Sequence, residues 1–127
     1  MAKPSNRPQQ KQNPKKNKNL KELLAEAESF AKQGHHQKAR ISYKIAVSLN
    51  PNSVKAILGL ASQLEEMGRL QLAEQEYQIA NSRFPDHLET YLQLSSILEK
   101  MGRTRKALNV FKKAVKNFLM IPVFISD

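Results

Sequence analysis

The chain has 127 residues, of which 40% are hydrophobic and 25% charged, so it has room for one domain with an ordinary apolar core. It has no cysteine, which excludes disulfide bonds, thiolate metal sites and a thiol nucleophile. No apolar run approaches the roughly 18 residues of a membrane span, and no secretory signal pattern is present at the N-terminus. We therefore expect a cytoplasmic protein without a membrane span.

The net charge of +10 is concentrated near the N-terminus. Residues 1–19 contain six Lys or Arg and no acid, whereas the other 15 basic and 11 acidic residues leave +4 for everything after Asn19. Pro4, Pro8 and Pro14 interrupt any helix there, and few apolar side chains are present to offset the entropy of ordering. We expect residues 1–19 to form a disordered basic tail.

Helical periodicity begins at Leu20, after which several residue types recur every 34 positions. Glycine is expected to end the first helix of each unit in a left-handed conformation, and proline to end the second. Alanine lets two helices approach closely, and an aromatic side chain fills the gap between units. The recurring sets are Gly34, Gly68 and Gly102; Ala39, Ala73 and Ala107; Tyr43, Tyr77 and Phe111; Ala46, Ala80 and Ala114; and Pro51 and Pro85.

The pattern predicts six helices, near residues 20–33, 36–49, 53–67, 70–83, 87–101 and 104–118. Asn19 with Glu22, at the first helix, has the spacing of a capping box. Ser53 is a candidate cap for the third helix. Asp86 with Glu89 has the capping-box spacing again, at the fifth helix.

The combined pattern resembles the tetratricopeptide repeat closely from residue 20 to about 120. Small residues also recur at Ala27, Ala61 and Ser95, while Leu23, Ile57 and Tyr91 stand where the family often has Trp. The resemblance implies an all-α fold, a right-handed superhelical stack of three helix–turn–helix hairpins forming an α-solenoid. The expected units are residues 20–53, 54–87 and 88–121, followed by an apolar C-terminal tail at 122–127.

In this family the first helix of each unit lines a concave groove that binds a peptide or a partner helix. Mapped onto this sequence, the groove contains a leucine at each 34-residue interval, surrounded by mixed charge. The leucines either contact a ligand or pack between the first helices. The candidate groove residues are Leu24, Glu28, Lys55, Leu58, Ser62, Glu65, Glu66, Glu89, Leu92, Ser96 and Glu99.

Some relatives in this family bind the acidic C-terminal tails of chaperones through a clamp of Lys, Asn and Arg. The matching positions here are Leu24, Glu28, Gly59, Glu89 and Gln93, and none of them fits. Glu28 and Glu89 would repel a carboxylate. We therefore expect that a chaperone C-terminal carboxylate tail is not the partner.

The last predicted helix is strongly basic, with no acid between residues 103 and 116. Together with the N-terminal tail it suggests binding to RNA, a ribosome, an acidic protein or an anionic membrane surface. A solvated helix face explains the same residues, and no aromatic side chains are interleaved for base stacking. The candidate basic surface is Arg103, Arg105, Lys106, Lys112, Lys113 and Lys116.

No constellation in the sequence predicts catalysis, a cofactor or a metal site. His35 and His36 are adjacent in a predicted turn, without a third ligand at a useful spacing, and we expect them to be solvated. Glu65 and Glu66 are consecutive and diverge on a helix. No phosphate-binding glycine loop or serine-centred elbow is present.

The C-terminal end of the repeat lacks the polar helix that usually closes a solenoid. Leu119 replaces the proline, and we expect the third unit to expose Val115 and Phe118. The apolar residues that follow could fold back as a cap, this surface could form a homodimer or bind a partner, or a further domain could follow. Our leading hypothesis is a non-enzymatic interaction adaptor, and the alternative is a factor that binds RNA or an anionic surface.

Overall fold

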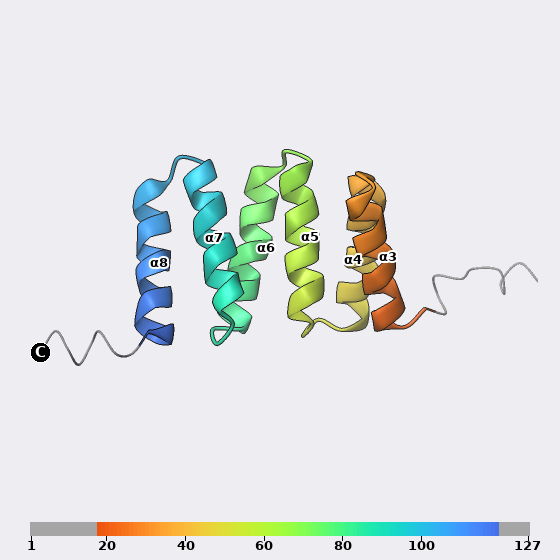
Figure 1. Ribbon diagram of the computed structural model, residues 1–127, viewed down its shortest axis with the longest axis horizontal. Helices are drawn as coiled ribbons and strands as arrows, with labels where there is room; N and C mark the ends of the chain where they lie inside the picture. The colour runs from red at the N-terminus through yellow and green to blue at the C-terminus, as the bar shows by residue number, and fades with distance from the viewer. Residues whose placement is uncertain (1–17, 120–127) are drawn as a thin grey trace, which may run out of the picture.

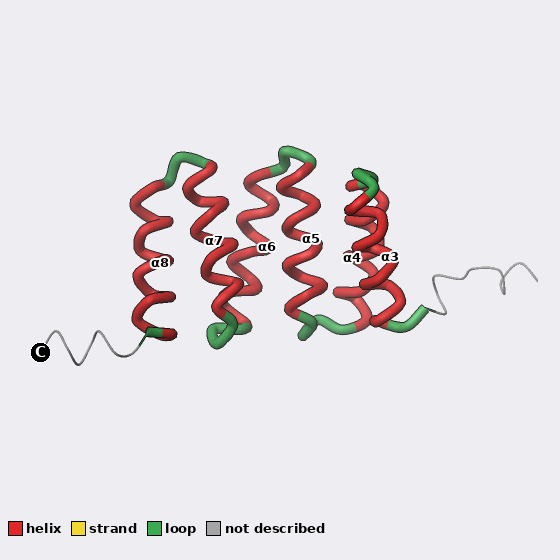
Figure 2. The backbone as a smooth tube through the Cα atoms, viewed as in Figure 1, coloured by secondary structure: helices red, strands yellow, loops and turns green. Residues whose placement is uncertain are grey.

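The computed structural model describes residues 18–119, in which six α-helices stand side by side in chain order (Figure 1). They form three consecutive antiparallel hairpins joined by short turns, and no strand occurs within this range (Figure 2). The fold is the predicted all-α solenoid. The helices are α3 (Leu20–Lys32), α4 (His36–Leu49), α5 (Val54–Glu66), α6 (Leu70–Arg83), α7 (Leu88–Lys100) and α8 (Thr104–Phe118).

Each first helix ends at a glycine in the left-handed conformation, as the 34-residue spacing predicts. Gly34, Gly68 and Gly102 have φ angles of 81°, 80° and 83°. A side chain is strained at such angles, so glycine is the favoured residue. The amide after the glycine donates back to the last turn, for example from His35 N to Phe30 O at 2.9 Å, and this releases the chain into the second helix.

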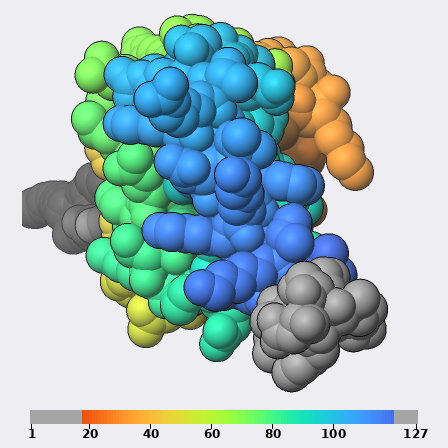
Figure 3. Space-filling model, turned by 90° about the vertical axis from the view of Figure 1, so that its left-hand side faces the viewer, coloured from red at the N-terminus to blue at the C-terminus, as the bar shows by residue number. Residues whose placement is uncertain are grey.

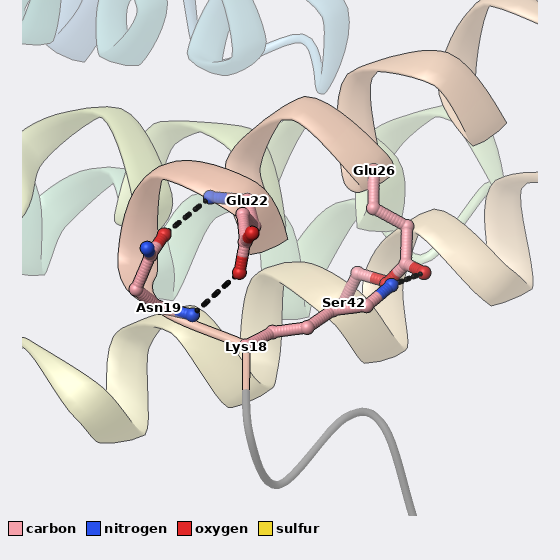
Figure 4. A network of polar contacts seen from close by, with 5 residues as sticks. All are labelled: Lys18, Asn19, Glu22, Glu26 and Ser42. Carbon is pink, nitrogen blue, oxygen red and sulfur yellow. Dashed lines mark hydrogen bonds and ion pairs between the residues drawn. The ribbon is translucent and has the colours of Figure 1, made fainter.

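The predicted cap of α3 is present and belongs to a polar network at this end of the stack (Figure 4). Glu22 N donates to Asn19 Oδ1 at 2.8 Å, and Asn19 N donates to Glu22 Oε1 at 3.1 Å. One turn further along, Glu26 accepts hydrogen bonds from Lys18 and from the buried Ser42 of α4. The first hairpin therefore satisfies its polar groups at its outer side with its own residues.

The second predicted capping box is wrong. The N-cap of α7 is His87, so Asp86 lies one residue too early to accept from the first turn. Thr90 Oγ1 instead donates to His87 O at 2.8 Å. His87 occupies the repeat position of Ser53, whose side chain does cap α5 by accepting from Ala56 N at 3.1 Å. The N-caps of α5 and α7 are thus 34 residues apart, like the other recurring positions.

Most of the core lies where helices of one hairpin approach each other and the next hairpin. The recurring alanines are buried in all three hairpins. At Gly59 of α5, an added Cβ atom would lie 2.2 Å from the ring of Tyr43 in α4. Glycine thus lets the Tyr43 ring pack directly on the backbone of the next hairpin, and this contact orients α5 against α4.

At the C-terminal end of the stack, the structure exposes other apolar residues than the sequence predicts. Phe118 is half-buried, because its ring packs edge-on against Tyr91 with 5.6 Å between centroids, and Val115 is also half-buried. The large apolar side chains that α8 exposes are Leu108 and Phe111. The basic N-terminal tail, apart from its last two residues, and the C-terminal tail at 122–127 lie outside the described residues.

Candidate peptide-binding groove

A hollow of about 470 Å³ lies between the first helices of the second and third hairpins. Its wall on one side is α5, which contributes Leu58, Gly59 and Ser62 among others, and on the other side α7, with Glu89 and Gln93. The ring of Tyr43 forms part of the lining from α4. The close packing of Tyr43 on Gly59 therefore shapes the hollow as well as the core.

The structure brings five of the eleven candidate groove residues toward this hollow or next to its lining. Lys55, Leu58, Ser62 and Glu89 line it directly, and Glu28 of α3 forms an ion pair with Lys55 at 3.0 Å. Sequence reasoning did not include Tyr43, Val54, Gly59, His87 or Gln93 among the groove residues. The first helix of each unit was expected to line the groove, whereas Tyr43 comes from a second helix and His87 from a turn.

The three leucines that recur every 34 residues in the candidate groove are not equivalent. Leu24 is half-buried, Leu58 is 9% exposed, and Leu92 is 43% exposed. Leu58 belongs to the core cluster, with its edge at the hollow, because helices on both sides pack against α5. Leu92 instead lines a second hollow of about 390 Å³ between α7 and α8, together with Ser96 and Glu99.

The charges of the groove are partly neutralised within the chain. Besides Glu28–Lys55, Glu65 pairs with Lys100, whose Nζ lies 2.5 Å from Glu65 Oε2. This hydrogen bond and the charge of Glu65 raise the pKa of Lys100. Within residues 18–119, Glu66, Glu89 and Glu99 have no ion-pair partner. The α5–α7 part of the groove therefore carries excess negative charge.

A buried phenol lies next to these acids. The Tyr77 hydroxyl donates to Glu65 Oε1 at 2.9 Å, and the side chain is 1% exposed. Burial raises the pKa of Tyr77 strongly, and the hydrogen bond to Glu65 with the charges of Glu65, Glu66 and Glu89 raises it further. Tyr77 is thus a neutral donor that fixes Glu65 in the groove wall.

The six candidate basic residues, which lie in α8 or at its N-cap, divide into two groups. Arg103 Nη1 lies 3.2 Å from Oε1 of the buried Glu74, so this guanidinium neutralises a carboxylate inside the stack. The other five are exposed and form no ion pair within the described chain: Arg105, Lys106, Lys112, Lys113 and Lys116. Of the six candidate residues, these five keep a charge that no ion pair within residues 18–119 neutralises.

One expectation for the histidines is wrong. His36 begins α4 and is half-buried, with its Nδ1 atom 2.7 Å from Oε1 of the buried Gln63. It links the first hairpin to α5 rather than lying solvated in a turn. Between residues 18 and 119, no group of three His, Asp or Glu side chains is placed to hold a metal ion.

No helix in the described range is both long and apolar enough to cross a membrane. No curated protein matches the chain by sequence. The family model described as tetratricopeptide repeat matches residues 88–117, which comprise the third hairpin.

Solved structures of tetratricopeptide repeat proteins share the fold of the whole stack. The translocator chaperone SycD of Yersinia enterocolitica, crystallised with a peptide of the translocator YopD, superimposes with a TM-score of 0.74 at 19% identity. The similarity covers 84% of this chain and 82% of that one. MamA gives 0.73 at 24% identity, over 85% of this chain and 61% of its own.

YrrB, described as a protein with an unusual peptide-binding site, has a TM-score of 0.72 at 20% identity. The similarity covers 80% of this chain and 52% of YrrB. The third hairpin thus matches the tetratricopeptide repeat model, and the six helices form three equivalent hairpins with the fold of about three such repeats.

Proposed function

We propose that this protein is an interaction adaptor that binds a peptide or a partner helix in the hollow between α5 and α7. The observation that carries the proposal is the hollow itself, which has an apolar floor at Leu58 and Tyr43 and polar walls. Such a combination suits an apolar anchor side chain flanked by polar contacts. SycD with its YopD peptide and YrrB with its peptide-binding site support the proposal, since both share this fold.

The charges favour a ligand with a basic residue beside its apolar anchor. Glu89 lines the hollow and is exposed without an ion-pair partner in the described chain, whereas Lys55 on the opposite wall is paired with Glu28. A Lys or Arg next to the anchor would meet Glu89 without displacing an existing pair. An acidic residue at the same place would be repelled.

A peptide array probed with the labelled full chain tests the proposal. Ser62→Arg places a long side chain in the hollow, and Ser82→Arg places the same side chain on the exposed surface of α6. We expect peptides with an apolar residue beside Lys or Arg to be bound by the wild type and by Ser82→Arg. We expect Ser62→Arg to lose them while its circular dichroism spectrum stays helical. Equal binding by both variants would refute the hollow as the site.

Glu89→Lys gives an independent check of the charge preference. We expect it to shift the selected peptides from basic to acidic neighbours of the anchor, because the unpaired charge on the wall changes sign. An unchanged preference would contradict the role of Glu89 while leaving the hollow itself untouched.

A further inference from the structure

The outer side of the third hairpin has the side chains of an interface but no described element over it. In the first two hairpins the recurring tyrosine is covered by the next hairpin, so Tyr43 is 6% and Tyr77 is 1% exposed. At the same repeat position Phe111 is 48% exposed, and Leu108 beside it is 49% exposed. Figure 3 views this end of the molecule, with α8 in blue in front of the other described helices.

Residue 108 is apolar, whereas the equivalent residues of the first two hairpins are charged. The equivalent residues are Arg40 in α4 and Glu74 in α6, both charged although the next hairpin follows them. At the terminal hairpin, where water would favour a polar residue, the chain has leucine. A solenoid that ends in solvent is expected to show the opposite pattern.

The other end of the stack shows what a solvated end looks like in this same chain. The face of α5 that packs on the first hairpin contains the buried Ala56, Leu60 and Gln63. At the equivalent positions, α3 has Glu22, Glu26 and Ser29, which are polar and satisfied by caps and hydrogen bonds. A second copy therefore has no apolar N-terminal face to stack on α8.

The end face is hollowed in a way that suits an inserted helix. Leu92 of α7 and Leu108 and Phe111 of α8 line the hollow of about 390 Å³ between these helices, with Glu99 at its edge. A flat membrane would contact a convex surface better than a recess. The shape thus favours a protein element over a lipid surface.

The charge at this end determines which protein element fits. Arg105, Lys112 and Lys116 are exposed and lie seven and four residues apart, so they follow one side of α8 next to Leu108. Two copies meeting face to face would bring these two rows of cations close together. An acidic helix would instead pair with the row.

We propose that this end face binds an acidic amphipathic helix of another protein, seated between α7 and α8 as a first helix of a further hairpin would be. The chain supplies the pattern for its apolar side, because α7 buries Thr90, Leu94 and Ile97 at the inner interface. The occupant presents a small residue, a leucine and an isoleucine at the same spacing. Its Asp or Glu residues lie along the side that meets Arg105, Lys112 and Lys116.

A designed helix makes the proposal testable without knowing the natural partner. The probe is a fluorescent synthetic helix of about 16 residues, long enough for four turns, with Ala, Leu and Ile at that spacing and Glu along one side. Fluorescence anisotropy with the full chain is expected to show saturable binding. A second probe, in which Lys replaces each Glu, is expected to bind at least about tenfold more weakly, and added salt should weaken the acidic probe.

Two variants with the same substitution localise the binding. Leu108→Lys alters the end face, and Leu72→Lys alters an exposed leucine of α6 outside it. Both residues are exposed, so both variants should keep the helical content of the wild type. We expect Leu108→Lys to weaken binding of the acidic probe at least about tenfold, and Leu72→Lys to leave it unchanged. Equal affinity of the two variants, or no binding by the wild type, would overturn the proposal.

Three further results would assign the face to another occupant and overturn the proposal as well. If Ile121→Asp with Phe124→Asp in the full chain creates a binding that the wild type lacks, the C-terminal residues occupy the face. A dimer in sedimentation that Leu108→Lys dissociates would indicate a second copy. Binding to vesicles of anionic lipid that Leu108→Lys abolishes, without binding of the acidic probe, would indicate a membrane surface.

Discussion

The first and third hairpins share one backbone design, yet their outer sides differ in chemistry. The outer side of α3 presents polar residues, with a capping box and a network through Glu26 that satisfies the buried Ser42. The outer side of α8 presents Leu108 and Phe111 beside a row of cations. In a repeat protein, each unit contacts only its neighbours, so the residues at the two ends decide where the stack stops. The described stack therefore has a polar N-terminal side and a partly apolar, basic C-terminal side.

The largest expected contrast compares one repeat position inside the stack with the same position at its open end. Tyr77→Ala removes a buried aromatic side chain and should lower the free energy of unfolding by about 3–5 kcal/mol. Phe111→Ala should lower it by less than about 1 kcal/mol, because nearly half of that side chain already contacts solvent. Urea denaturation followed by circular dichroism measures both. Similar losses would show that something covers Phe111 in the isolated protein.

A second contrast concerns the faces of α5 and α3 that point toward the N-terminus. Gly59→Val should lower the free energy of unfolding by about 1–3 kcal/mol, because its side chain would overlap the Tyr43 ring. The equivalent residue of α3 is Ala25, which is exposed with no hairpin before it. Ala25→Val should therefore cost only the difference in helix propensity, less than about 1 kcal/mol. Thermal unfolding of both variants checks this, and a harmless Gly59→Val would disprove the tight contact.

Of the two aromatic residues compared above, Tyr77 has an ionisable hydroxyl group and Phe111 does not. The pKa of Tyr77 is raised in the folded protein, so above pH 10 the unfolded chain releases a proton that the folded chain retains. Stability is therefore intact below pH 10 and falls as pH rises above it, by about 1.4 kcal/mol at pH 11 for this group.

Tyr77→Phe should remove this part of the alkaline loss, as measured by urea denaturation at pH 8, 10 and 11. Any loss at neutral pH from the missing hydrogen bond to Glu65 is constant across the series and is subtracted. An identical pH dependence in wild type and variant would show that Tyr77 ionises normally in the fold.

The smallest expected effects compare the N-cap of α3, Asn19, with Asp86, which does not cap α7. Asn19→Ala should lower the free energy of unfolding by about 1 kcal/mol, because α3 loses its capping box. Asp86→Ala should change it by less than about 0.5 kcal/mol, since Asp86 does not cap α7. Both are measured by thermal unfolding. A larger effect for Asp86→Ala would restore the cap that the local sequence spacing predicts.

The sequence by itself determined the repeat, the order of the helices and their ends to within one residue. These features depend on local conformation: a left-handed glycine after each first helix, a proline after each of the first two second helices, and small or aromatic side chains in fixed register. One local motif was misleading, because the capping-box spacing of Asp86 and Glu89 did not mark the start of α7, whose N-cap is His87.

Only the tertiary structure decided which members of a periodic set remain accessible. The three groove leucines are alike in sequence, but Leu58 is 9% exposed with only its edge at a hollow, whereas Leu92 is 43% exposed. Glu65 was a candidate ligand contact, yet it is held by Tyr77 and by Lys100, 35 residues further along the chain. Burial and pairing depend on the neighbouring hairpins, whose side chains are distant in sequence. The periodic pattern alone therefore could not specify them.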